Sequence, residues 1–149
     1  MGTQQYFIDC YREIVRQFPN RIALDDGIKQ YSHSDLWQRS LVVAGLLQQY
    51  GVEQGSHVGL YQKKSADLVA SMLGCWMSGV VFVPLDPTLP TERTLFYAND
   101  ARLSVLLYAE SPPKWPFDMP MLTILEANTE GVIQQLSGDQ PAYLLYSSG

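Results

Sequence analysis

Residues 79–100 read GVVFVPLDPTLPTERTLFYAND and contain the clearest strand-and-helix pattern of the chain. The run Val80 to Pro84 is short and almost wholly apolar, which is typical of a strand that is covered on both faces. The run Pro90 to Asn99 predicts a helix with proline in its first turn, where the missing N–H group is not needed. A buried strand followed by a helix is the repeating unit of a parallel sheet.

The same alternation recurs on both sides of this segment. Short apolar runs predict strands at His57 to Tyr61, Ser104 to Tyr108 and Met121 to Leu125. The run Ser65 to Ser78 predicts a helix that is apolar on nearly every side and ends at Gly79. Together these elements predict an α/β fold with a mainly parallel sheet, helices on both faces and right-handed crossovers. In such sheets ligands bind outside the carboxyl ends of the strands.

The N-terminal part predicts a helix and a β-hairpin. From Gln4 to Phe18 apolar residues recur every three or four positions, which places them on one helix face. The turn dipeptide Asp26-Gly27 predicts a hairpin between the runs Ile22 to Leu24 and Ile28 to Tyr31.

A second helix is expected after the hairpin. Ser32 and Asp35 fit a capping-box pattern at its start, and Gly51 follows its last turn, where a left-handed residue is favoured. The apolar face of this helix is expected to comprise Leu36, Val43, Leu47 and Tyr50.

Composition excludes several classes of function. Hydrophobic residues make up 46% of the 149 residues, so the chain can bury a sizeable core. The formal net charge is -5, so the basic surface that nucleic-acid binding needs is absent. No leader peptide and no apolar run of bilayer-spanning length is present, which predicts a cytoplasmic protein without a membrane partner.

The two cysteines do not indicate a metal or disulfide site. Cys10 and Cys75 lie far apart, and no Cys or His accompanies either at metal-ligand spacing. Both are therefore predicted to be buried reduced thiols, and no metal site is predicted.

Residues 79–100 resemble a segment of the adenylate-forming ligases, and specifically of the amino-acid adenylation domains of nonribosomal peptide synthetases. The family pattern is Gly-x-x-(Tyr/Phe)-Val-Pro-(Ile/Leu)-Asp-Pro-x-x-Pro-x-Glu-Arg. Its positions match Gly79, Pro84, Asp86, Pro87 and Arg93 among others.

Two further segments carry the same resemblance in the same order. The terminal AYLLYSSG is similar to the start of the family's phosphate loop, which usually continues as Thr/Ser-Thr-Gly-x-Pro-Lys-Gly. The segment YSHSDLWQRS, from Tyr31 to Ser40, resembles an early (Thr/Ser)-Tyr-x-Glu-Leu element, with Asp35 in place of Glu.

The resemblance implies an ATP-dependent ligase. Such an enzyme uses ATP and Mg²⁺ to convert an amino acid or other carboxylate into an acyl-adenylate. It then transfers the acyl group to the phosphopantetheine thiol of a peptidyl carrier protein. Residues 1–149 would be its first sub-domain, ending within the phosphate loop, with the remainder of the ligase as a partner. Ser147, Ser148 and Gly149 would then contact the ATP phosphates.

This chain lacks the second half of the phosphate loop, the substrate pocket and the catalytic lysine of the family. No catalytic residue is therefore assigned within it, and the chain alone is predicted to be inactive. Lys63 and Lys64 match no motif that would give either of them that lysine's role. His33 and His57 have no nearby carboxylate or nucleophile in the sequence and are not assigned acid–base roles.

Two residues of the motif have structural interpretations. The Asp86 carboxylate, which lies between prolines, is expected to cap the helix that follows. Arg93 is expected to be an ion-pair or surface residue of that helix.

Two alternatives remain open at this point. The first is a fragment of an acyl- or aryl-CoA ligase, although PLDP resembles the peptide-synthetase branch, whereas CoA ligases more often have Asn-Pro there. The second is a non-catalytic α/β interaction module, because every catalytic element in the chain is incomplete.

Overall fold

The computed structural model describes residues 3–116, 118–134 and 143–146. Its regular elements follow the order that the sequence predicts. The helices are α1 (Thr3–Gln17), α2 (His33–Gln49), α3 (Ala66–Met77), α4 (Thr91–Asp100) and a 3₁₀ turn, η1 (Ile124–Glu126). The strands are β1 (Ile22–Asp25), β2 (Gln30–Ser32), β3 (His57–Tyr61), β4 (Val81–Leu85), β5 (Val105–Tyr108) and β6 (Met121–Thr123).

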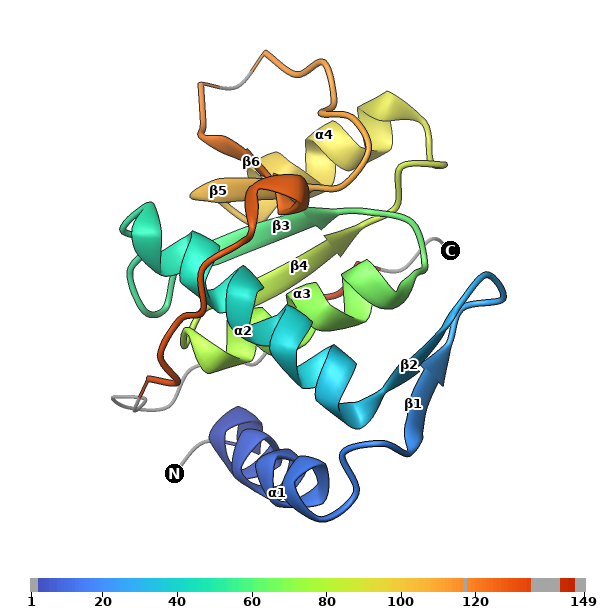
Figure 1. Ribbon diagram of the computed structural model, residues 1–149. Helices are drawn as coiled ribbons and strands as arrows, with labels where there is room; N and C mark the ends of the chain where they lie inside the picture. The colour runs from blue at the N-terminus through green and yellow to red at the C-terminus, as the bar shows by residue number, and fades with distance from the viewer. Residues whose placement is uncertain (1–2, 117, 135–142, 147–149) are drawn as a thin grey trace.

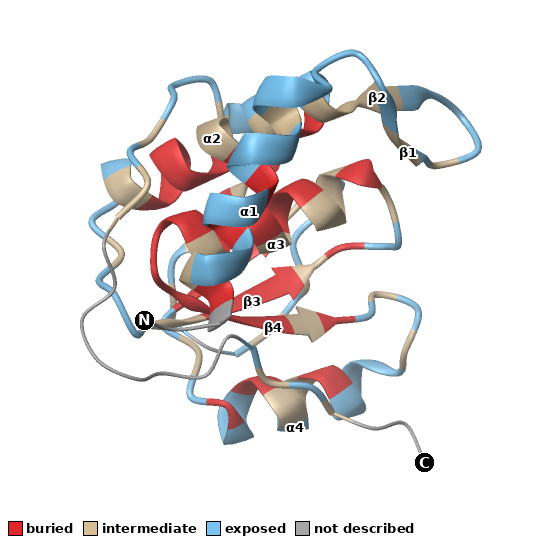
Figure 2. Cartoon of the chain, turned by 90° about the horizontal axis from the view of Figure 1, so that it is seen from below, coloured by how far each residue is buried: buried red, intermediate tan, exposed pale blue. Residues whose placement is uncertain are grey.

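The main sheet is parallel and has the strand order β4-β3-β5-β6. Helices α2 and α3 cover one face and α4 covers the other, while α1 lies outside α2 and α3 (Figures 1 and 2). The predicted α/β fold, with a parallel sheet and helices on both faces, is confirmed. A separate antiparallel hairpin, β1 and β2, is also present as predicted.

The crossover directions explain why α3 and α4 lie on opposite faces. The chain moves from β3 through α3 to β4 on one side, and then returns through α4 past β3 to β5. Because such crossovers are right-handed, reversing the direction along the sheet moves the connecting helix to the other face. The loops that follow β3 and β4 therefore diverge.

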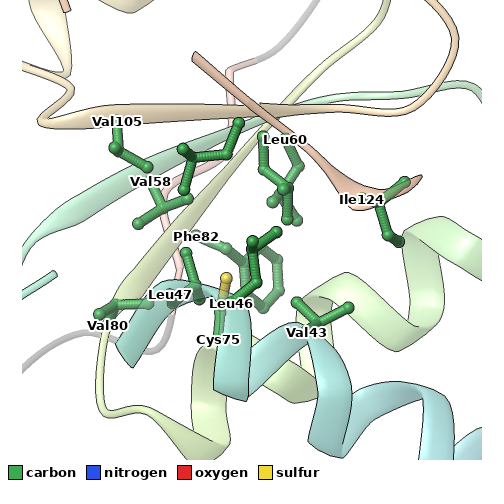
Figure 3. Packing of buried hydrophobic residues seen from close by; sticks show 12 residues of the cluster. Val43, Leu46, Leu47, Val58, Leu60, Cys75, Val80, Phe82, Val105 and Ile124 are labelled. Carbon is green, nitrogen blue, oxygen red and sulfur yellow. The ribbon is translucent and has the colours of Figure 1, made fainter. Parts of the chain in front are cut away.

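The largest hydrophobic cluster fills the space between the sheet and helices α2 and α3 (Figure 3). Val43 and Leu47 of α2 meet Val58 and Leu60 of β3 there, and all four side chains are fully buried. Each such side chain contributes roughly 1.5–3 kcal/mol on leaving water. This cluster is therefore the main stabilising contact of the two layers.

Helix ends follow the local signals in the sequence. The Ser32 hydroxyl accepts a hydrogen bond from the Asp35 N–H at 3.0 Å, and the Asp35 carboxylate accepts one from the Ser32 N–H at 3.1 Å. The capping box is thus confirmed. Gly51 and Gly79 have φ values of +71° and +72°, in the left-handed region that follows a helix.

Several sequence predictions about burial or boundaries are wrong in detail. The strand predicted from Met121 to Leu125 ends at Thr123, where the 3₁₀ turn η1 follows. Cys10 is exposed, because it lies about 100° around α1 from Tyr11, whose side faces α2. Tyr50 is 55% exposed, because it is the C-cap residue at which α2 ends. Pro90 occupies the N-cap position of α4, one residue before the helix begins.

The thiol of Cys75 is buried and free, and burial raises its pKa well above the usual range. No helix in the described ranges has both the length and the apolar character needed to cross a bilayer.

Candidate functional site

The candidate site lies at the carboxyl edge of the sheet, between the ends of β3 and β4. Here the chain leaves β3 toward one face and β4 toward the other, so the two loops open a crevice between them. A cavity of about 640 Å³ occupies this place. Its lining comprises Gln62, Lys63, Lys64, Leu68, Pro84, Leu85, Asp86, Thr88, Leu89, Tyr97, Leu145 and Tyr146.

The segment 143–146 reaches this cavity at its end, where Leu145 and Tyr146 belong to the lining. Tyr143 pairs in parallel with Phe82 of β4, and the Leu144 N–H donates to the Phe82 carbonyl at 3.0 Å. The Tyr143 ring also stacks on the Phe82 ring, with centroids 5.5 Å apart. Because the pairing is parallel, the segment runs toward the same edge of the sheet at which β4 ends.

The turn after β3 is held by a buried amide. Gln62 is 4% exposed, and its side-chain N–H group donates to the Ser71 hydroxyl at 3.0 Å and to the Leu107 carbonyl at 3.4 Å. These contacts join the end of β3 to α3 and to β5. They fix the place from which Lys63 and Lys64 project.

Lys63 and Lys64 are exposed cations at the cavity. The Lys63 ammonium lies 3.6 Å from a carboxylate oxygen of Glu110, which follows β5. The sequence analysis did not predict that Lys63 and Lys64 line this cavity, because neither lysine belongs to a known motif. One signal could have indicated this location: both lysines directly follow a predicted strand of a parallel sheet, and ligands bind at such strand ends.

Asp86 does not cap the following helix, so that prediction is wrong. Its carboxylate accepts hydrogen bonds from the Thr88 N–H at 2.9 Å and the Thr88 hydroxyl at 2.7 Å. A short acidic side chain readily bonds to the backbone two residues ahead, and this turn precedes the start of α4. The Thr88 hydrogen bonds, with a smaller contribution from the positive charge of Lys64, lower the pKa of Asp86. Asp86 is therefore an anion at neutral pH.

The other predicted motif residues divide between the two edges of the sheet. Pro84 and Pro87 lie at the carboxyl edge, and Pro87 lines a second cavity of about 500 Å³ on the β5 side of Gln62. Gly79 lies at the opposite edge, in the turn before β4, where its carbonyl accepts from the Gly55 N–H at 2.9 Å. It contributes a left-handed turn to the fold.

Arg93 is exposed on α4, as expected for a surface residue of that helix. It lines a separate hollow of about 490 Å³ with Pro90, Glu92, Phe96 and Tyr97. Ser147, Ser148 and Gly149, the predicted phosphate-binding residues, lie outside the described residues.

The described residues fit a nucleotide phosphate in part. Lys63 and Lys64 supply positive charge at the cavity, and Asp86 is the carboxylate in its lining. Mg²⁺ is usually held by one or two carboxylates together with phosphates, so Asp86 is the group that would meet such an ion there. In the described part of the chain, no three His, Cys, Asp or Glu side chains come together as metal ligands.

The chain matches the family described as AMP-binding enzyme over residues 11–149. It is 32% identical to syringomycin synthase SyrB1 of Pseudomonas syringae pv. syringae, covering 95% of this chain and 24% of that protein. The chain thus spans only about a quarter of the length of this relative.

Two solved structures extend the comparison. A four-domain nonribosomal peptide synthetase, holo-AB3403 bound to AMP and glycine, is 31% identical with a TM-score of 0.75, over 80% of this chain and 9% of that one. The N-terminal subdomain of Klebsiella oxytoca NpsA, in complex with 3-hydroxyanthranilyl-AMSN, is 25% identical with a TM-score of 0.81, over 95% of this chain and 38% of that one.

Proposed function

The chain belongs to the AMP-binding enzyme family, and we propose that it is the N-terminal sub-domain of an amino-acid adenylation domain. The solved relatives support this branch of the family, since AB3403 is a nonribosomal peptide synthetase bound to AMP and glycine. In this proposal residues 1–149 need the remainder of the ligase for activity.

The proposed reaction has two steps. A carboxylate oxygen of the amino acid attacks the α-phosphorus of ATP, the bond to pyrophosphate breaks, and an aminoacyl-adenylate forms. The phosphopantetheine thiol of a carrier protein then takes the aminoacyl group, and AMP leaves. ATP supplies the adenylyl group, and Mg²⁺ would offset the charge of its phosphates.

The observation that supports this proposal most directly is the course of the segment Tyr143–Tyr146. It runs parallel to β4 and ends beside the cavity that Lys64 and Asp86 line. Ser147 follows Tyr146 in the sequence, so the predicted phosphate-binding residues come directly after this segment in the chain. The positive charges of Lys63 and Lys64 would attract an anionic substrate to that edge.

Reading the coding sequence after the codon for Gly149 is the first test of this proposal. We expect Thr or Ser, followed by Thr-Gly-x-Pro-Lys-Gly. A stop codon at that point would instead favour the interaction module, and the search for a function would turn to a binding partner.

Exchange of labelled pyrophosphate into ATP then tests the reaction. The ligase that carries this chain is expected to catalyse exchange that depends on an amino acid. The 149-residue chain alone is expected to give no exchange above a protein-free control. Exchange that depends on a fatty or aryl acid, with thioester formation on free CoA, would identify the CoA-ligase alternative.

A further inference from the structure

Tyr146 is held by two residues of α4. Its ring stacks on the Tyr97 ring, with centroids 4.5 Å apart and an angle of 22° between the planes. Its hydroxyl donates to a carboxylate oxygen of Asp100 at 2.8 Å. Tyr97 and Asp100 are three residues apart on the helix and so lie on the same side of it. One side chain thus receives both a stacking and a charged hydrogen-bonding contact from one helix surface.

These contacts complete the anchoring of the segment 143–146. Its start is fixed to β4 through the pairing and ring stacking of Tyr143 with Phe82. Its end is fixed by Tyr146, which also packs against the cluster of Val83, Leu85, Ala101 and Leu106. The two ends of the segment are therefore held by different elements.

We propose that Tyr97, Asp100 and Tyr146 form a latch that fixes the chain where it enters the phosphate-binding loop, so that Tyr146 and Asp100 are positioning residues for adenylation. This inference rests on the proposed function, since it concerns the loop that begins at Ser147. Tyr146 is the last residue before the predicted loop in the sequence, so contacts that hold Tyr146 hold the point at which the loop begins. Misplacement of a catalytic element by about 1 Å can lower a rate by about 10²-fold.

The hydroxyl of Tyr146 is well suited to a permanent latch. Burial, and then the hydrogen bond to Asp100, raise its pKa to about 12. It therefore stays protonated and able to donate at neutral pH. The latch is not expected to open with pH near neutrality.

Four substitutions separate the latch from general stabilisation. Tyr146→Phe keeps the ring and its stacking but removes the hydroxyl. Asp100→Ala removes the acceptor, whereas Asp100→Asn retains an oxygen that can accept the hydrogen bond. Tyr143→Phe is the matched control, because it removes a hydroxyl from the same segment that has no hydrogen-bond partner among the described residues.

The first measurement is hydrogen–deuterium exchange of the peptide 143–149 in the whole chain. Tyr146→Phe and Asp100→Ala are expected to speed exchange of this peptide by about tenfold, with the rest of the chain unchanged. Asp100→Asn and Tyr143→Phe should remain near the wild-type rate. Wild-type exchange rates in both Tyr146→Phe and Asp100→Ala would overturn the latch.

The second measurement is ATP–pyrophosphate exchange by the ligase that carries this chain. Tyr146→Phe and Asp100→Ala are expected to lower kcat/KM for ATP by about tenfold and to leave KM for the amino acid unchanged. Variants that match an active wild type would overturn the positioning role. A wild type without exchange would contradict the proposed function instead, and the deuterium measurement would still decide whether the latch holds the segment.

Discussion

Among the described glycines, Gly45 is the one at which an added Cβ atom would come closest to another part of the chain. A Cβ atom there would lie 1.8 Å from the Thr129 carbonyl oxygen, far inside van der Waals contact. Gly74, in α3, shows a milder approach, because its Cβ would lie 2.7 Å from a methyl group of Val43. Both glycines are inside helices, so alanine would gain about 1 kcal/mol of helix propensity at either site.

We therefore expect Gly45→Ala to destabilise the protein more than Gly74→Ala. At Gly45 the overlap with a backbone oxygen is severe and costs about 3 kcal/mol or more, whereas at Gly74 the nearest atoms, in the Val43 side chain at 2.7 Å and the Ser40 carbonyl at 2.9 Å, need a smaller shift. Urea unfolding of the two variants measures this difference. Equal stability of both variants would show that the segment around Thr129 does not lie against α2 in solution.

Burial of the Tyr11 side chain leads us to expect that the protein loses stability at high pH. Its side chain is 9% exposed, its hydroxyl lies 2.8 Å from Nδ1 of His33, and burial raises its pKa to about 12. Because the pKa is higher in the folded chain than the ordinary value of 10, the stabilisation is complete below pH 10 and is lost as the pH rises toward 12.

The pH dependence of urea unfolding measures this contribution. Between roughly pH 9.5 and pH 11.5, the free energy of unfolding should fall less steeply in Tyr11→Phe than in the wild type. Tyr50→Phe, at a tyrosine that is 55% exposed, is the control and should keep the wild-type slope. Identical slopes in Tyr11→Phe and the wild type would contradict the assignment.

At the scale of elements, the capping box joins the hairpin to the α2 layer. Ser32 ends β2 and is also the N-cap of α2, so its backbone and side chain serve both elements. Ser32→Ala is expected to cost about 1 kcal/mol of unfolding free energy, because the Asp35 N–H loses its acceptor. Ser32→Asp retains an acceptor and should lose less. Ser34→Ala, in the first turn of α2, provides the comparison for propensity alone.

The contact between α2 and the segment after η1 could not be predicted from local sequence patterns. The segment after η1 crosses α2, where the side-chain amide of Gln48 accepts from the Val132 N–H at 3.0 Å and donates to the Val132 carbonyl at 2.7 Å. These partners are 84 positions apart. Helical and strand periodicities connect residues only a few positions apart, so this contact could not be predicted from the pattern.

At the scale of the whole molecule, the two clusters beside α2 and α3 should unfold together. Helix α2 contributes Val43 and Leu47 to one cluster and Leu36 and Ala44 to the other, while Trp76 packs against both. Melting either cluster therefore removes contacts from the other, which favours a single cooperative transition.

Tryptophan fluorescence and far-UV circular dichroism test this cooperativity. Trp37 of α2 packs against the cluster that includes Ile8 and Tyr11 of α1, and Trp115 packs against the cluster of Val83, Leu85, Ala101 and Leu106, so the two report on different regions. Because the chain has three tryptophans, the double variants Trp76→Phe/Trp115→Phe and Trp37→Phe/Trp76→Phe leave Trp37 and Trp115, respectively, as the single fluorophore. We expect the urea midpoints of both signals to coincide. An earlier transition at Trp37 alone would show that α1 detaches before the sheet unfolds.

The sequence by itself determined the elements and the family of this protein. Caps, turn dipeptides and apolar periodicity act within a few residues, so they located α2, α3, β3 and β4 closely, and the PLDP segment carried the family resemblance. Its one local error at the site, Asp86, arose because two hydrogen bonds from Thr88 compete with a cap farther along the chain.

Only the tertiary structure decided which residues meet. The cavity forms because successive crossovers place α3 and α4 on opposite faces, which opens the sheet edge beside Gln62, Lys64 and Asp86. The latch of Tyr146 on α4 likewise joins positions 46 residues apart. Such contacts depend on the direction of the crossovers and on packing between layers. Neither of these produces a periodic pattern in the sequence.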